Sequence, residues 1–336
     1  MILILSSASD GHAAHVAELL QKRGAAFVCF NPARFPRHAE LSLSFTPSGR
    51  PTAVLHVDGE AIDLASVQTA WYRRPEKPIA HDEVRDATAR AYVEQECHLV
   101  LQDLWSALDC RWLPGPPSVV RHAEGKLLQL KVAAALGFEL PPTVVTNRSA
   151  DVLALHRQCN GQIVSKQAGK AFSGAVGDHL IRYTELVSTR DLAHAGAIAY
   201  CPMTFQAYVP KRVELRITVV GRQVFAAEIH SQITNHTRHD WRRYDHDRTP
   251  YHPHQLPRDL ERRCVQLVES LGLRYGAIDM VLTPDGRYVF LEINPNGQYL
   301  WIEGATGLPI SDAICDLLTA TGATHGARRA AIGEIP

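Results

Sequence analysis

The sequence predicts an α/β fold, α+β in parts, built from more than one packed unit. An apolar run at residues 1–5 is followed by a polar loop, an amphipathic stretch and a second apolar run at 27–30. This order is typical of a β-loop-α-β unit with parallel strands. Later, two apolar runs within 277–293 flank Asp285-Gly286, the pattern of an antiparallel hairpin. The chain has 336 residues, 46% of them apolar, which is enough for two or three hydrophobic cores.

The remaining elements are predicted from the spacing of apolar residues and from the positions of proline and glycine. Residues 41–57 alternate around a proline-glycine turn and predict a second hairpin, and apolar residues spaced along 84–108 predict a long helix with one buried stripe. Helix cannot continue through 113–117, Leu-Pro-Gly-Pro-Pro, so this run marks the clearest boundary. We therefore expect an N-terminal domain at 1–115 and a central subdomain with a glycine-rich loop at 116–205. A C-terminal subdomain with a carboxylate hairpin is expected at 206–322, followed by a flexible tail at 323–336.

Composition excludes several classes of protein. Lysine and arginine number 35, and aspartate and glutamate also number 35. This balance argues against a protein whose main role is to coat nucleic acid or to bind an anionic membrane. No apolar run approaches the roughly 20 residues of a spanning helix. The seven cysteines are odd in number, widely spaced and contain no C-x-x-C pair, as expected for reduced thiols in a cytoplasmic protein. We expect neither nucleic acid nor membrane as a partner.

The late hairpin carries the strongest chemical signal. If Asp285-Gly286 forms a two-residue turn, Asp279 lies opposite Glu292, and the period of two places Asn294 on the same face. Two acids buried this close need a cation between them, and oxygen ligands with room for phosphates favour Mg²⁺ over Ca²⁺. A three-residue loop would send the acids to opposite faces. A solvent-facing strand with ordinary acids is the other interpretation, which the apolar neighbouring positions disfavour.

Two lysines are candidate phosphate ligands. Lys166 ends a short apolar run and precedes the glycine-rich segment 167–177, whose backbone N–H groups are suited to phosphate oxygens. Lys126 lies on the helix that follows the proline-rich boundary. The segment 167–177 does not match a Walker A sequence, so a mobile surface loop stays open as an alternative for it. For Lys126, the alternative is an ordinary solvated lysine on a helix.

Taken together, these residues resemble the ATP-grasp superfamily over roughly residues 115 to 320. The matching pieces, in order, are Lys126, Pro141-Pro142-Thr143, Lys166 with its glycine loop, Gln206-Ala-Tyr-Val209, Glu214-Leu-Arg216, and Asp279 with Glu292-Ile-Asn294. Segments 71–75, 205–211, 240–242 and 291–303 are similar to those of the graspetide maturases, which cross-link microviridin-type ribosomal peptides. The resemblance implies an ATP-grasp fold preceded by a small parallel-sheet, pre-ATP-grasp domain.

The resemblance also implies residue roles. Lys126 and Lys166 are expected to hold the α- and β-phosphates, Gln206, Tyr208 and Val209 to line the adenine pocket, Glu214 to bind the ribose, and Asp279, Glu292 and Asn294 to hold Mg²⁺. Arg216 is expected to meet the γ-phosphate or acyl phosphate. Arg242 is expected to add a further cation, because Ala277 stands where some small-molecule relatives carry arginine. Arg73 and Arg74 are expected either to contact the peptide substrate or to form an ion pair between domains.

The implied activity is that of an ATP-dependent carboxylate ligase. Asp or Glu side chains of a ribosomal precursor peptide, with leader and core, would be activated as acyl phosphates and joined to Ser or Thr hydroxyls or Lys amines. ATP and Mg²⁺ are the expected cofactors, and a homodimer is expected. A carboxylate–amine ligase similar to RimK or glutathione synthetase is the alternative enzyme, and a non-catalytic peptide- or nucleotide-binding scaffold is the alternative from another class. The histidine-rich segment 230–254 matches a zinc site poorly and is expected to face the substrate.

Overall fold

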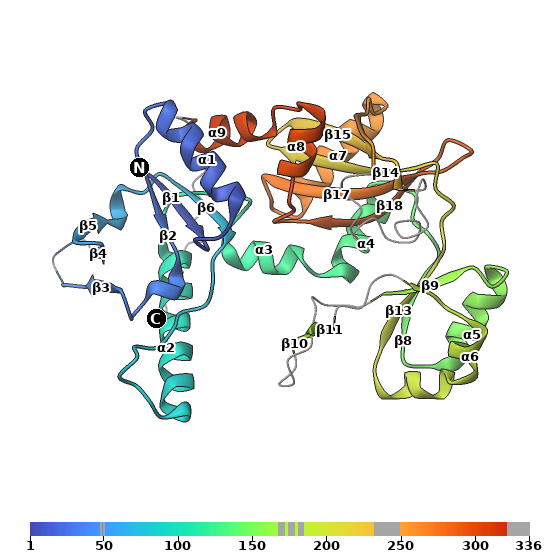
Figure 1. Ribbon diagram of the computed structural model, residues 1–336, viewed down its shortest axis with the longest axis horizontal. Coiled ribbons are helices and arrows are strands. Elements are labelled where there is room, and N and C mark those ends of the chain that lie inside the picture. The colour runs from blue at the N-terminus through green and yellow to red at the C-terminus, as the bar shows by residue number, and fades with distance from the viewer. Residues whose placement is uncertain are drawn as a thin grey trace, which may run out of the picture. The chain divides into compact units, whose positions relative to one another are not determined.

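The chain divides into two compact units (Figure 1). The structure is a computed structural model that describes residues 1–47, 49, 51–166, 172–173, 179–180, 185–231 and 249–320. Unit 1 comprises Met1–His122, Gly272–Tyr275 and Pro309–Pro336, and unit 2 comprises Ala123–Leu271 and Gly276–Leu308. Each unit is therefore assembled from more than one stretch of the chain. The tail expected at 323–336 lies outside the described residues.

A parallel four-stranded sheet in the order β2-β1-β6-β7 forms the centre of unit 1. Its strands are β1 (Ile2–Ser6), β2 (Phe27–Phe30), β6 (Thr69–Arg74) and β7 (Arg111–Leu113). Helix α1 (Gly11–Lys22) connects β1 to β2, and α2 (Ala87–Ala107) lies between β6 and β7 in the chain. The predicted β-loop-α-β unit is confirmed. Because one connection runs from β1 toward β2 and the other from β6 toward β7, the strand order reverses between β1 and β6.

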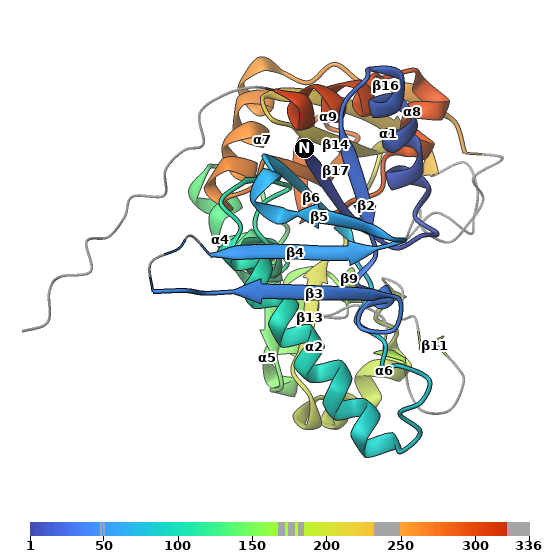
Figure 2. The same ribbon diagram turned by 90° about the vertical axis from the view of Figure 1, so that its left-hand side faces the viewer.

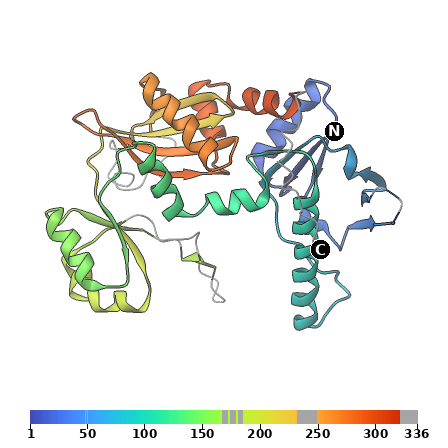
Figure 3. The same ribbon diagram turned by 180° about the vertical axis from the view of Figure 1, so that it is seen from behind.

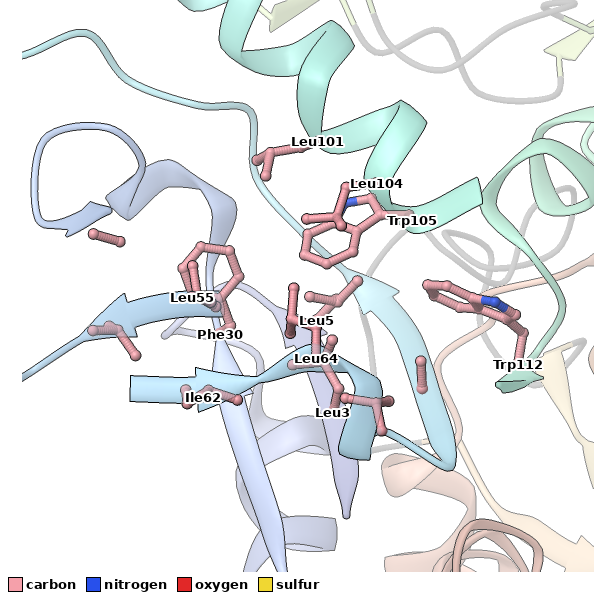
Figure 4. Close-up of a cluster of buried hydrophobic side chains, with 14 residues drawn as sticks. Leu3, Leu5, Phe30, Leu55, Ile62, Leu64, Leu101, Leu104, Trp105 and Trp112 are labelled. Carbon is pink, nitrogen blue, oxygen red and sulfur yellow. The ribbon is translucent and has the colours of Figure 1, made fainter. Parts of the chain in front are cut away.

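A smaller antiparallel sheet completes the core of unit 1. Its strands are β3 (Ala39–Ser44), β4 (Thr52–Val57) and β5 (Glu60–Asp63), with short 3-10 helices at Pro32–Arg34 and Leu64–Ser66. Figure 2 shows β3 and β4 side by side, and Leu41 pairs with Leu55, which confirms the predicted hairpin. Apolar side chains from both sheets and α2 form one cluster (Figure 4). Within it, the rings of Phe30 and Trp105 meet edge to face at 6.3 Å.

Unit 1 also receives the last described helix of the chain. Helix α9 (Ile310–Thr319) packs against α1. Arg23, the C-cap residue of α1, donates hydrogen bonds of 2.6 Å to both Asp312 and Asp316. These partly exposed ion pairs contribute on the order of 1 kcal/mol or less each. Helix α3 (Pro117–Ala123) leads into unit 2. No helix among the described residues combines the length and the apolar character that crossing a membrane requires.

The first sheet of unit 2 has the order β12-β9-β13-β8, with antiparallel pairs throughout. Its strands are β8 (Thr143–Thr146), β9 (Ile163–Lys166), β12 (Glu185–Leu186) and β13 (Met203–Ala207), and its helices are α5 (Ser149–Gln158), α6 (Thr189–Ala193) and a 3-10 helix at Ala195–Tyr200. The short strands β10 (Phe172–Ser173) and β11 (His179–Leu180) pair with each other. A small apolar cluster that includes Val152, Ile163 and Phe205 fixes α5 to this sheet.

The second sheet of unit 2 has the order β16-β15-β14-β17-β18. Its strands are β14 (Val213–Val220), β15 (Gln223–Ile229), β16 (Tyr251–Pro253), β17 (Tyr275–Leu282) and β18 (Tyr288–Asn294), and its helices are α4 (Lys126–Ala135), α7 (Arg258–Ser270) and α8 (Leu300–Thr306). Every residue of β14 and β17 is buried. Helix α7, orange in Figure 3, packs on β14 and β15. The polar residues of β14 and β17 are therefore held in a rigid, largely dry framework.

Candidate active site

The hairpin of β17 and β18 carries the two predicted metal-binding acids. Asp279 pairs with Glu292, so the predicted pairing is confirmed. The turn that was expected to cause it is not present, because the strands are joined by the three-residue loop 284–286, with Gly286 at φ +85°. A loop of this length alone would place the acids on opposite faces. The register shifts between Asp279 and Met280, and this irregularity, a one-residue bulge, restores the pairing.

Arg216 of β14 neutralises Asp279. Its Nη1 donates to the two carboxylate oxygens of Asp279 at 2.9 and 3.1 Å, and its Nη2 donates to the carbonyl of Gln298 at 2.9 Å. Arg216 is 4% exposed, and a charge-assisted bond in such a place is strong and well oriented. The approach depends on Gly297, because a Cβ there would lie 2.6 Å from Arg216 Nη2 and would overlap Ala277.

Lys126 neutralises the second acid. It is the first residue of α4, and its Nζ donates to Glu292 Oε2 at 2.7 Å. One turn further along, the buried side chain of Gln129 donates to the carbonyl of Ala123 at 2.7 Å and accepts from the N–H of Ile293 at 3.2 Å. Gln129 thus ties the start of α4 to β18 and sets the position from which Lys126 reaches Glu292.

Lys166 belongs to a chain of hydrogen bonds across three strands. Its Nζ donates to Gln206 Oε1 at 2.6 Å, Gln206 Nε2 donates to Thr143 Oγ1 at 2.9 Å, and Thr143 Oγ1 donates to the carbonyl of Pro141 at 2.7 Å. An ammonium can only donate, so the direction of each bond along the chain is fixed. The side chain of Gln206, expected in the adenine pocket, is therefore oriented by Lys166 and Thr143.

Glu214 lies on β14, two residues before Arg216. Both Lys211 Nζ and Ser231 Oγ donate to Glu214 Oε1 at 2.8 Å, and all three side chains are buried. A buried carboxylate needs such donors to stay ionised.

The predicted adenine-pocket residues Tyr208 and Val209 directly follow β13. The N–H of Tyr208 donates to the carbonyl of Gln162 at 2.9 Å.

Comparisons with known proteins identify the family. Residues 1–119 match the family described as the MvdD pre-ATP grasp domain. The macrocyclase MdnC from Microcystis aeruginosa MRC, solved with its precursor peptide MdnA, is 32% identical with a TM-score of 0.82, over 94% of this chain and 98% of that chain. A RiPP-associated ATP-grasp ligase from Chryseobacterium gregarium, solved with ADP and a leader and core peptide, is 34% identical with a TM-score of 0.87, over 94% of this chain and 96% of that chain. The chain belongs to the graspetide-type ATP-grasp ligases.

Two further comparisons complete this picture. The ATP-grasp ligase PsnB is 22% identical with a TM-score of 0.75, over 94% of this chain and 97% of that chain, and shows the same fold. Among curated proteins, none matches this chain. The two relatives above 30% identity confirm the predicted ATP-grasp fold and ligase activity.

The donor set of this graspetide-type ligase suits a hard divalent cation. Asp279 and Glu292 face each other in register, and Asn294 is two residues beyond Glu292 on the same strand face. Asn294 Oδ1 accepts from the N–H of Asn296 at 3.1 Å. In the described part of the chain no group of three or more His, Cys, Asp or Glu is arranged for a metal. Two carboxylates and one amide oxygen fit Mg²⁺, which takes few protein ligands and completes its shell with water and phosphate.

Of the remaining predicted site residues, Arg242 falls outside the residues that the structure describes. In the predicted glycine-rich loop 167–177, the same is true of residues 167–171 and 174–177. In unit 1, Arg73 Nε lies 3.4 Å from Asp10 Oδ1 and Arg74 Nε lies 4.0 Å from Asp10 Oδ2. Burial by itself raises the pKa of Asp10, but Arg73 holds that pKa below its usual value. Asp10 and both arginines belong to unit 1, so these two contacts lie within one unit. The peptide contact and the ion pair between domains both stay predictions.

Sequence reasoning missed Gln129, Lys211 and Ser231. The signal for Gln129 was a polar residue one turn after Lys126 on a helix whose neighbouring positions are apolar. Lys211 is one of the few lysines in an arginine-rich chain and precedes Glu214 by three residues, which was a usable signal. Nothing in the sequence separates Ser231 from other serines, because its partner is distant in the chain.

Proposed function

We propose that this ligase activates Asp or Glu side chains of a ribosomal precursor peptide as acyl phosphates. The activated groups are then joined to Ser or Thr hydroxyls or Lys amines, which closes rings through ω-ester or ω-amide bonds. The observation that carries the proposal is the facing pair Asp279 and Glu292, each held by a basic side chain, in unit 2. The C. gregarium ligase, 34% identical, supports it because that structure holds ADP together with a leader and core peptide.

The nucleotide residues follow the arrangement of unit 2. Lys126 and Lys166 bind the α- and β-phosphates, and Glu214 accepts from the ribose hydroxyls. Gln206 and the Tyr208–Val209 backbone line the adenine pocket. Lys166 and Glu214 are already held in place by neighbours, so little ordering of these two side chains is needed when ATP binds.

Asp279, Glu292 and Asn294 are the residues that would hold Mg²⁺. The bound ion supplies charge neutralisation for phosphoryl transfer, a reaction that depends on positioning and electrostatics more than on covalent help from the protein. PsnB, which shares the fold at 22% identity, has been solved with Mg and ADP. The absence of catalytic activity without a divalent cation is the expected consequence.

The basic side chains of the site serve the reacting groups. A carboxylate is a poor electrophile, so a peptide acid must first take the γ-phosphoryl group of ATP. The acceptor hydroxyl or amine then attacks the carbonyl carbon, and the C–O bond to phosphate breaks. Phosphate leaves with the electron pair of that bond and takes up the proton that the acceptor loses. Arg216, buried beside Asp279, and Arg242 neutralise the negative charge on the phosphoryl group and the acyl phosphate. Arg73 and Arg74 contact the peptide.

Mass spectrometry tests the proposal directly. The chain is incubated with ATP, Mg²⁺ and a short peptide encoded beside it that is rich in Thr or Ser and in Asp or Glu. Each bond formed removes one water from the peptide and releases one ADP. Glu292→Gln should abolish both changes, whereas Glu269→Gln, at an exposed acid near the end of α7, should leave both intact. ADP release that the peptide does not stimulate, with no loss of water, would contradict the proposal.

The proposal includes a homodimer in the cytoplasm, acting on leader and core together. Light scattering of the purified chain at micromolar concentration tests the dimer. A mass equal to one chain would remove that part of the proposal and leave the chemistry untouched.

A further inference from the structure

The outer edge of β18 records the register of the hairpin that carries the two acids. Strand β18 comes last in the order of its sheet, so one of its edges has no neighbouring strand in the described part of that sheet. In an extended strand, the N–H groups of alternate residues point toward the same edge. The N–H of Phe290 points toward the outer edge, because it donates to the carbonyl of Glu139 at 2.9 Å.

A second N–H on this edge is out of step with that alternation. Strict alternation from Phe290 would bring the N–H of Glu292 to the outer edge. Instead, the N–H of Ile293 donates to Oε1 of Gln129 at 3.2 Å. The extra residue at Leu291 accounts for the difference, because a bulge moves every later residue by one position. The hydrogen bond between Ile293 and Gln129 can therefore form in the bulged register and not in the regular one.

The same bulge sets the two acids opposite each other. The three-residue loop alone would place Asp279 and Glu292 on opposite faces, and the bulge restores their pairing. A bulge leaves one residue unpaired and disrupts the ladder locally, so the regular register competes with the bulged one. A hydrogen bond that is made in one of two conformations and not in the other shifts the balance between them. Gln129 supplies such a bond.

Gln129 is held in place for this role. The residue is 1% exposed, and its Nε2 donates to the carbonyl of Ala123 at 2.7 Å, which turns Oε1 toward Ile293. Its backbone N–H donates to the carbonyl of Gly125 at 3.0 Å, in the first turn of α4. Helix α4 packs against β18. The amide therefore presents an oriented acceptor to the edge of the strand.

We propose that Gln129 is a positioning residue for the divalent cation and acts by holding the bulged register of β18. Ile293, its partner, lies between the expected ligands Glu292 and Asn294 in the strand, and the register of this segment decides whether Glu292 faces Asp279. The part of the inference that concerns the metal rests on the proposed function. The part that concerns the register rests on the backbone of the hairpin.

Amide hydrogen exchange of the full chain, resolved to single residues by fragmentation mass spectrometry, measures the register. The N–H of Ile293 should be protected in the wild type. Gln129→Leu removes both amide hydrogen bonds, so exchange at Ile293 should accelerate about tenfold. The N–H of Phe290, which a backbone carbonyl holds, should keep its rate, and this separates a local change from a loss of global stability. Gln266→Leu, at an exposed position of α7, should change neither rate.

Metal binding is measured separately, by electron paramagnetic resonance with Mn²⁺ as the probe and ADP at saturation. Mn²⁺ takes the same oxygen ligands as Mg²⁺. Gln129→Leu should weaken Mn²⁺ binding about tenfold, the loss typical when a group that orients a metal ligand is removed. The affinity for ADP without metal should change at most about twofold, and Gln266→Leu should match the wild type in both measurements.

Three results would overturn the inference. They are an unprotected Ile293 N–H in the wild type, equal exchange at Ile293 in wild type and Gln129→Leu, and a Gln129→Leu chain that melts earlier but binds Mn²⁺ as the wild type does. If Gln129→Leu does not fold, Gln129→Met, with an unbranched side chain of similar length, replaces it with the same expectations. A wild type that binds no Mn²⁺ with ADP would contradict the proposed function itself, whereas equal Mn²⁺ binding by wild type and variant contradicts this inference alone.

Discussion

Removing the hydroxyl of Thr143 should disturb the position of Lys166, to which Thr143 is linked through Gln206. In wild type, Gln206 Nε2 donates to Thr143 Oγ1 at 2.9 Å while Gln206 Oε1 accepts from Lys166 at 2.6 Å. Thr143→Val keeps the shape of the side chain but leaves that N–H donor without its acceptor. Gln206 is 3% exposed, and an unsatisfied buried donor costs about 1–3 kcal/mol. We expect the free energy of unfolding to fall by about 1–2 kcal/mol.

The same change should weaken nucleotide binding. Without Thr143 the Gln206 amide loses the bond that fixes its orientation, so the position of Lys166 becomes less defined. The dissociation constant for ADP should rise about three- to tenfold, which corresponds to about 0.7–1.4 kcal/mol. Urea denaturation measures the first effect and isothermal titration calorimetry the second. Unchanged stability together with unchanged ADP affinity would show that the hydrogen-bond chain does not position Lys166.

A matched control exists on β14. Thr218 is 0% exposed, and its hydroxyl has no hydrogen-bond partner among the residues that the structure describes. Thr218→Val makes the same chemical change at a site where no bond is lost. The free energy of unfolding should stay equal or rise by up to about 1 kcal/mol. A loss of stability like that of Thr143→Val would mean that the substitution itself, and not the lost bond, is responsible.

Three further changes test other parts of the site. Gly297→Ala should lower the rate of ADP formation at least about a hundredfold, because its Cβ displaces Arg216 and overpacks the core, whereas Gly304→Ala, with open space around its Cβ, should keep full activity in the same assay. Burial raises the pKa of Glu228, but hydrogen bonds with its two histidine partners hold it below its usual value, so the stability it adds is present above the unfolded pKa near about 4.3 and is lost as pH falls through the folded pKa. Glu228→Gln should therefore lower the free energy of unfolding at neutral pH and reduce the loss of that free energy on acidification. If urea denaturation gives the same loss of stability between neutral and acidic pH in wild type and variant, this prediction is contradicted. Glu292→Gln should flatten the increase of ADP affinity with Mg²⁺ concentration, measured by calorimetry, and an unchanged increase would remove this residue from the metal site.

The sequence was most informative where one periodic pattern decided the outcome. Apolar runs gave the parallel strands of unit 1 and the hairpin of unit 2. The pairing of Asp279 with Glu292 was predicted from a two-residue turn, yet the structure reaches it through a three-residue loop and an extra residue at Leu291. The loop and the bulge each shift the register by one, and their effects cancel. A bulge leaves no reliable mark in a sequence of alternating apolar residues, so its position could not be predicted.

The side-chain partners of the site were harder to predict than its ligands. Lys126, Arg216 and Glu214 were predicted as site residues through the resemblance, but their side-chain partners were not predicted. The partners of Lys126 and Arg216 are distant in the chain: Lys126 and Glu292 are separated by 166 residues, and Arg216 and Asp279 by 63. Sequence patterns describe which face a residue occupies. Which side chain meets another across that face depends on sheet order and on packing, which the structure supplies.

The pairing of each acid with a base has a consequence for how the site must work. Lys126 donates to Glu292 at 2.7 Å, and Arg216 donates to Asp279 at 2.9 Å. Each basic side chain must therefore leave its acid before it can bind a phosphate. Removing one partner of such a pair leaves the other charge uncompensated, which is costly where the groups are buried. The Arg216–Asp279 pair is buried, so Arg216 can turn toward a phosphate at low cost only when another cation neutralises Asp279. The nucleotide and a divalent cation are then expected to bind cooperatively, and this buried acid–base pair is the element that couples the two.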